Sequence, residues 1–227
     1  MQTAAFFDMD GTLLRGESQL SFLLWCWRRS IAPRWKSVKV VAAYLAYLSG
    51  VSRDAGQLRD LGFSLFQGLD ARQLNDAGEV FFASCLSIRI RRQASAVVQR
   101  HRDLNHRTVL VTSASETVAR PLAAALKVDE LIATHLLLDE GRYSGSRKRP
   151  EPYGVEKRLL VEQYSNDHAI SLASSYAYSD HHSDLPLLEA VGNPIVVQPT
   201  RELREVARQR GWITADLDGP SLQHQIV

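Results

Sequence analysis

Residues 6–14 of the chain read FFDMDGTLL. The apolar run over residues 3–7 predicts a short buried strand, and Asp8 and Asp10 follow where that strand meets solvent. Gly11 and Thr12 then let the chain turn sharply away. Carboxylates this close repel each other unless a cation or a proton intervenes, and Mg²⁺ is a hard cation that prefers oxygen ligands. The stretch therefore predicts a magnesium site at the end of a strand.

A second apolar, β-branched run ends in small hydroxyl residues: residues 108–115 read TVLVTSAS. If this strand lies parallel to the first, the Thr112 hydroxyl and the Ser113 backbone N–H arrive beside the acids. There they could bind phosphate oxygens, helped by the N-terminus of the following helix. The alternative is that these hydroxyls only cap that helix.

A third apolar run, in YAYSDHHSDLPLLE over residues 176–189, ends in Asp180, and Asp184 follows four residues later. Pro186 suits the first turn of a helix. Asp180 and Asp184 supply further oxygens for the predicted metal site. We expect His181 and His182 to lie at its mouth or on the surface.

These three segments, in this order, resemble the motifs of the haloacid dehalogenase (HAD) superfamily, whose first signature is D-x-D-G-T. The whole chain is most similar to subfamily IB, the phosphoserine-phosphatase-like hydrolases. That resemblance implies an α/β fold, with a Rossmann-like parallel sheet as its core and a helical C1 cap inserted after the first strand. It also implies a Mg²⁺-dependent phosphomonoesterase.

The resemblance assigns roles to individual residues. Asp8 would attack the phosphorus and form an aspartyl-phosphate, while Asp10 would act as acid and then as base. Mg²⁺ would be held by Asp8, the Asp10 backbone carbonyl and Asp180, with Asp184 fixing that shell. Thr112 and the Ser113 amide would balance charge on the phosphate oxygens.

HAD enzymes also use a lysine to neutralise the nucleophile and the phosphate. Lys157, in GVEKRLL over residues 154–160, fits the G-x-x-K form of one branch of the superfamily. Phosphoserine phosphatases tend to place this lysine before the glycine, where Tyr153 stands in this chain. Lys148 is the fallback, and the alternative for either lysine is an ordinary solvated charge.

The helical pattern of residues 16–94 predicts the cap domain, and residues 1–15 and 95–227 the core. Within the core, residues 139–145 predict a hairpin turn, residues 194–199 the last parallel strand, and residues 201–210 a final helix. We expect the tail from Asp216 to be loosely held.

Composition suits a globular enzyme. The 227 residues are 45% hydrophobic and 23% charged, and the net charge of +2 is too small to indicate nucleic acid binding. Cys26 and Cys85 predict buried free thiols in a reducing compartment. The N-terminus lacks a signal-peptide pattern, which favours the cytoplasm.

The apolar stretch over residues 38–51 is too short to span a membrane, which needs about 20 residues. Two interpretations stay open for it: a cap helix packed on its neighbours, or a helix lying at a membrane surface. Both exclude integral membrane insertion.

Substrate choice is expected to come from the cap. Glu17 and Arg53, with Arg59 as a substitute for Arg53, stand near the offsets where phosphoserine phosphatases grip an amino acid. The alternative is that these are solvated charges. We expect a small polar phosphomonoester as substrate, with a lipid phosphate as runner-up and a non-catalytic binding or regulatory protein as the alternative of another class. A homodimer is a possible assembly.

Overall fold

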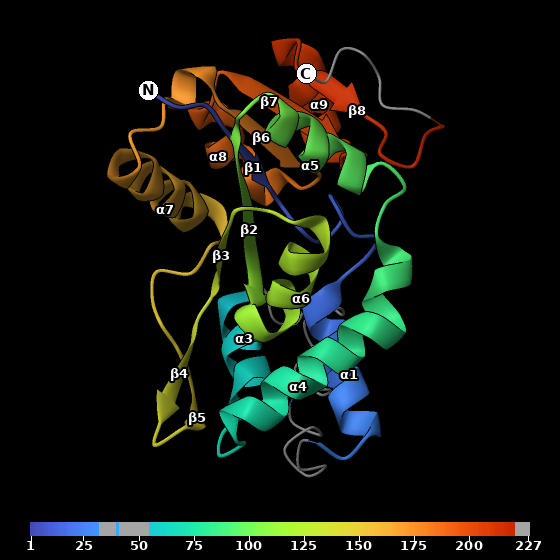
Figure 1. Cartoon of the computed structure of the whole chain (residues 1–227), viewed down its shortest axis with the longest axis vertical. Coiled ribbons are helices and arrows are strands. Elements are labelled where there is room, and N and C mark those ends of the chain that lie inside the picture. The colour runs from blue at the N-terminus through green and yellow to red at the C-terminus, as the bar shows by residue number, and fades with distance from the viewer. Residues whose placement is uncertain (32–39, 41–54, 221–227) are drawn as a thin grey trace.

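The computed structural model describes residues 1–31, 40 and 55–220, with the backbone alone described for residues 55–59. A parallel sheet with helices on both faces forms one end of the molecule, and a group of helices forms the other (Figure 1). Both chain ends of the described part lie near the sheet. The expected α/β fold is confirmed.

The main sheet has six strands in the order β3-β2-β1-β6-β7-β8, all parallel. The central strand β1 spans Ala4–Phe7, close to the prediction, and every residue in it is buried. The other strands are β2 (Arg107–Ser115), β3 (Glu130–Thr134), β6 (Tyr176–Ser179), β7 (Asn193–Val197) and β8 (Ile213–Ala215).

Alternation along the strands divides the core into two layers. Phe7 and Tyr178 face the layer that contains α5 (Ala94–Asp103) and α6 (Glu116–Leu126). Phe6 and Ala177 face the layer that contains α7 (Gly154–Asp167), α8 (Leu185–Ala190) and α9 (Arg201–Arg210). Because both faces are covered, the central strand β1 is apolar throughout, as buried parallel strands usually are.

Helices fill the chain between β1 and α5, and we call this region the cap. Its described helices are α1 (Ser18–Arg28), α3 (Ala55–Ser64) and α4 (Ala71–Phe81), followed by short π and 3₁₀ turns over Phe82–Leu86 and Ser87–Arg89. The predicted helix of residues 38–48 lies outside the described residues, apart from Val40. The division of the chain into two domains stays a prediction.

A hairpin leaves the core and reaches the cap. Its strands are β4 (Leu136–Asp139) and β5 (Arg142–Arg147), and the turn between them is tighter than predicted. Backbone hydrogen bonds join Tyr143 on β5 to Gly68 and Leu69, which follow α3, and β5 also packs against α3 itself (Figure 1). The cap is therefore tied to the core by more than its two covalent connections.

The C-terminal region differs from the sequence prediction. The helix over residues 201–210 is confirmed: the Thr200 side chain accepts a hydrogen bond from the Leu203 N–H, and Gly211 ends the helix at φ +68°. The strand before it is not the last one, because β8 follows. The tail from Asp216 is not loose as far as residue 220, since Leu217 is fully buried. A strand of three residues gives too little pattern to be recognised from sequence.

Two further expectations can be compared with the structure. Cys26 is buried, and burial raises the pKa of its thiol to about 12, but Cys85 is only half-buried because it lies on the π turn at the cap surface. Among the described residues, no helix is long and apolar enough to cross a membrane.

Candidate active site

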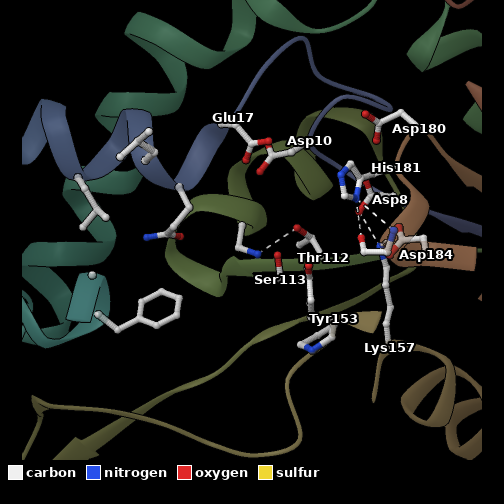
Figure 2. A pocket seen from close by; sticks show the side chains of 18 of the residues that line it. Asp8, Asp10, Glu17, Thr112, Ser113, Tyr153, Lys157, Asp180, His181 and Asp184 are labelled. Atoms are coloured by element: carbon white, nitrogen blue, oxygen red, sulfur yellow. Dashed lines mark hydrogen bonds and ion pairs between the residues drawn. The ribbon is translucent and has the colours of Figure 1, made fainter. Parts of the chain in front are cut away.

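Three neighbouring strands bring the predicted residues together. Asp8 follows β1, Thr112 and Ser113 lie near the end of β2, and Asp180 follows β6. Because β1 pairs in parallel with both β2 and β6, the carboxyl ends of all three meet at one edge of the sheet. A cavity of about 400 Å³ opens there between sheet and cap, and it is lined by nearly all the predicted site residues (Figure 2).

A buried lysine connects two of the acids. Lys157 Nζ lies 2.6 Å from Asp8 Oδ1 and 2.5 Å from Asp184 Oδ2, and Ser179 Oγ donates to Asp184 Oδ2 at 2.8 Å. Burial alone would lower the pKa of Lys157, but Asp184 and Asp8 raise it above its ordinary value. Burial raises the pKa of Asp8 to about 6, although Lys157 opposes this shift. Lys157 is therefore held as a cation against Asp8.

Lys148, the other candidate, is exposed and does not line the cavity. Its backbone N–H donates to the His135 carbonyl after β5. Asp184 contacts Lys157, and its expected role in fixing the metal shell stays a prediction.

A single hydroxyl bridges two acids on the other side of Asp8. Thr12 Oγ1 lies 3.1 Å from both Asp8 Oδ2 and Asp180 Oδ1, and one proton cannot satisfy both. Burial and the nearby Asp8 charge raise the pKa of Asp180 to about 7. Gly11, at φ +76°, lies so close that a Cβ there would come within 2.1 Å of Asp180 Oδ2.

These features fit a divalent cation. Burying Asp8 and Asp180 with one shared hydroxyl proton leaves negative charge that a cation would neutralise. The described residues contain no cluster of three or more His, Cys, Asp and Glu side chains suited to a metal. Mg²⁺ commonly uses one or two carboxylates and completes its shell with water and phosphate oxygens. The pair Asp8 and Asp180 meets that requirement.

Asp10 has a separate environment. Its carboxylate accepts hydrogen bonds from the backbone N–H and the hydroxyl of Ser18, at 3.0 and 2.8 Å, where α1 begins. Burial, together with the charge of Glu17, raises the pKa of Asp10 well above its usual range. Figure 2 shows the carboxylates of Glu17 and Asp10 side by side, apart from the group around Lys157. Both influences favour the protonated form of the Asp10 carboxyl.

Thr112 is not a helix cap. The residue before α6 is Ser115, whose side chain makes no capping bond, while Thr112 Oγ1 accepts from the Ala114 N–H at 3.1 Å. Thr112 is buried, and both it and Ser113 line the cavity.

Sequence reasoning missed Gln19. Ser115 donates to Gln19 Oε1 through its backbone N–H and its hydroxyl, both at 2.9 Å, while Gln19 Nε2 is buried without a partner among the described residues. Since a backbone N–H needs an acceptor, these contacts fix which end of the amide is nitrogen. Gln19 was missed because a glutamine in the first turn of a helix carries no sequence signal.

The cap also lines the cavity with apolar side chains: Leu20, Leu23, Val40 and Phe63. Glu17 lines the cavity as predicted. Arg53 and the side chain of Arg59 lie outside the described residues.

Comparisons with known proteins agree with this geometry. The sequence matches the haloacid dehalogenase-like hydrolase family over residues 5–189, more than half of the chain. It is 29% identical to a probable phosphatase of Mycobacterium tuberculosis, over 99% of this chain and 79% of that protein. It is 24% identical to a histidinol-phosphatase of Neisseria meningitidis, over 93% of this chain and 97% of that one.

A solved structure of a protein of unknown function from Bordetella pertussis is also similar. It has a TM-score of 0.83 and 31% identity, over 95% of this chain and 99% of that one. A phosphoserine phosphatase with an analogue of the phospho-aspartyl intermediate shares the fold, with a TM-score of 0.65 and 15% identity over 96% of this chain and 94% of that one. The chain therefore belongs to the haloacid dehalogenase-like hydrolases, as its motifs indicate.

Proposed function

We propose that this protein is a Mg²⁺-dependent phosphomonoesterase that works through an aspartyl-phosphate on Asp8. The observation that carries the proposal is the contact of Lys157 with Asp8 in a cavity where Asp10 lies apart and protonatable. One carboxylate is paired with a cation and the other is poised to hold a proton. Acid–base and nucleophilic roles are usually divided between two carboxylates in this way.

In the first half of the reaction, a carboxylate oxygen of Asp8 attacks the phosphorus and the ester P–O bond breaks. The departing alkoxide takes the proton from Asp10. In the second half, Asp10 takes a proton from water, whose oxygen attacks the same phosphorus and releases inorganic phosphate from Asp8. Thr112, the Ser113 N–H and Lys157 would balance charge on the phosphate oxygens throughout.

Mg²⁺ would be held by Asp8, Asp180 and the backbone carbonyl of Asp10. When bound, it would supply positive charge that lowers the repulsion between the nucleophile and the phosphate.

We further propose that the substrate is the phosphate ester of a small amino alcohol. Glu17 lines the cavity as an anion that suits an ammonium group, and the apolar side chains around Phe63 suit a carbon skeleton. Gln19 Nε2, buried at the cavity wall, would gain its missing partner from a hydrogen-bond acceptor on the alcohol. Relatives that are named phosphoserine phosphatase and histidinol-phosphatase act on esters of this kind.

The free thiols of Cys26 and Cys85 fit a reducing compartment, which supports a cytoplasmic location. A homodimer stays a prediction that sedimentation can check.

The reaction is tested with p-nitrophenyl phosphate. We expect Mg²⁺-dependent hydrolysis that EDTA stops. Mg²⁺ should also raise the thermal midpoint of the wild type, because a ligand of the folded state stabilises it, and should not raise that of Asp180→Asn. A midpoint shift that persists in Asp180→Asn would show that the cation binds elsewhere.

The substrate class is tested with O-phosphoserine, O-phosphoethanolamine, histidinol phosphate and a lipid phosphate in vesicles. Preference for the vesicle substrate would replace the amino-alcohol proposal with the lipid one. Absence of turnover on every ester would favour a non-catalytic role.

A further inference from the structure

The two chain segments that join cap and core lie side by side. The segment leaving the core runs over residues 11–17, and the returning segment over residues 89–93. Arg15 N–H donates to the Arg89 carbonyl and Arg91 N–H to the Leu13 carbonyl, each at 2.9 Å. These bonds make the paired segments one unit, which we call the junction.

A carboxylate from the C-terminal segment binds both sides of this junction. Asp218 Oδ1 accepts from Arg15 Nη2 at 2.6 Å, and Asp218 Oδ2 accepts from Arg91 Nη1 at 2.5 Å. Gln198, after β7, donates to the same carboxylate at 3.1 Å. Hydrogen bonding from Arg15, with support from Gln198 and Arg91, holds the pKa of Asp218 well below its usual range.

Arg91 carries this contact onward to the catalytic loop. Its Nη2 donates to the Gly11 carbonyl at 2.6 Å and its Nε donates to the same oxygen at 3.2 Å. The guanidinium is therefore shared between Asp218 and the backbone next to Asp10. Gly11 cannot shift freely, because its Cα lies against Asp180.

We propose that Asp218 is a positioning residue, which holds the junction and the Gly11 carbonyl so that Asp10 faces the leaving oxygen of the substrate. It does not touch the reacting atoms and acts through Arg91. The backbone adds to this fixation, since Gln93 N–H donates to the Leu217 carbonyl at 2.8 Å. Asp218 thereby ties the C-terminal segment to the junction.

The inference rests on the proposed phosphatase reaction, and its test separates the two. The value of kcat/KM reports the steps up to release of the alcohol. In these steps the alkoxide of an alkyl ester needs the proton of Asp10 in order to leave, whereas p-nitrophenolate leaves without a proton. Asp218→Asn should therefore lower kcat/KM for O-phosphoethanolamine by about tenfold and leave that for p-nitrophenyl phosphate within about threefold. Asp218→Glu, which keeps the charge, should restore part of the loss.

Asp216→Asn is the matched control. Asp216 lies on the same segment and makes no ion pair with the junction arginines. Its Oδ1 accepts from Gln198 Nε2 at 2.9 Å and from the Asp218 N–H at 2.8 Å, and an asparagine side chain keeps that acceptor. It should leave both kcat/KM values and their ratio unchanged. Equal losses on both esters in Asp218→Asn would make Asp218 merely structural and overturn the proposal.

Amide hydrogen exchange needs no substrate, so it tests the role of Asp218 even if no ester is hydrolysed. In Asp218→Asn, amide hydrogens of residues 11–16 and 89–93 should exchange faster than in Asp216→Asn, because the junction loses its side-chain anchor. If the wild type hydrolyses no ester, the proposed reaction fails while exchange still decides whether the junction is held. Unchanged exchange in Asp218→Asn would overturn the positioning role by itself.

Discussion

The two ends of the active-site cavity are built differently. At the sheet end, Asp8, Lys157 and Asp184 are linked by ion pairs of 2.5–2.6 Å and lie on elements of the packed core. At the cap end, Glu17 has no such partner among the described residues, and Gln19 leaves a donor unpaired. The groups that would hold the phosphate are therefore positioned in advance by ion pairs, whereas the groups that would select the alcohol keep hydrogen-bonding capacity for the substrate.

The largest effect expected at the sheet end is that of the nucleophile. Asp8→Asn keeps the size of the side chain but replaces the carboxylate with a poor nucleophile, so turnover of p-nitrophenyl phosphate should fall by at least about 10⁴-fold. Circular dichroism and a thermal melt should show an intact fold. Turnover near the wild-type level would place the nucleophile elsewhere.

Replacing Lys157 at the sheet end should also lower activity, but by less than replacing Asp8. Lys157→Met leaves Asp8 and Asp184 buried without their cation, so activity should fall by about 10²-fold or more, and the free energy of unfolding by about 3–5 kcal/mol. Chemical denaturation measures the second effect.

Lys148→Met is the matched control for this change. Lys148 is exposed and outside the cavity, so its replacement should alter neither quantity. An equal loss in both variants would contradict the assignment of Lys157.

The sheet end was predictable from the sequence and the cap end was not. Asp8, Thr112 and Asp180 each follow an apolar run in the sequence, and such runs are recognisable as buried strands. The carboxyl ends of parallel strands meet at one edge of the sheet, so the three residues could be expected to lie together. The lysine was ambiguous between Lys157 and Lys148, since only the path of the chain after β5 decides which of them reaches Asp8.

The missed features depend on long-range packing. Gln19 acquires its importance from Ser115, which lies far along the chain, and Asp218 acquires its importance from Arg15 and Arg91. Neither contact has a local sequence pattern. The ion pair between Asp184 and Lys157 likewise depends on how α7 packs near α8. The spacing of Asp180 and Asp184 in the sequence does not indicate it.

At the cap end, smaller effects are expected, and they should depend on the substrate. Glu17→Gln removes the anion that suits an ammonium group, and Gln19→Glu keeps the acceptor for Ser115 while removing the free donor. Each should raise KM for an amino-alcohol phosphate by about tenfold, because a ground-state contact is lost.

The same two variants should hydrolyse p-nitrophenyl phosphate within a few-fold of the wild type. Steady-state kinetics on both esters gives the comparison. A matching loss on p-nitrophenyl phosphate would mean that the cap end takes part in the chemistry, and the contrast between the two ends would fail.

The last effect concerns a buried histidine that packs against Tyr178 on β6, next to the sheet end. His101 on α5 is fully buried, its Nε2 lies 2.7 Å from the Tyr178 hydroxyl, and its Nδ1 lies 2.9 Å from His106 Nδ1. Burial, with the charges of His106 and Arg100, lowers the pKa of His101 from 6.5 to about 3. Below pH 6.5 His101 therefore binds a proton in the unfolded chain but not in the folded protein. Its contribution makes the free energy of unfolding fall as the pH falls. By pH 5 this group should cost about 2 kcal/mol. Asp8 and Asp180 act in the opposite direction, because their pKa values are raised in the folded protein.

The measurement is therefore the difference in unfolding free energy between wild type and His101→Gln at pH 7.5 and pH 5. At pH 5 that difference should shift in favour of the variant by about 2 kcal/mol. His182→Gln, at an exposed position, should show the same change in unfolding free energy between the two pH values as the wild type. A difference that does not change with pH would mean that His101 accepts a proton inside the fold.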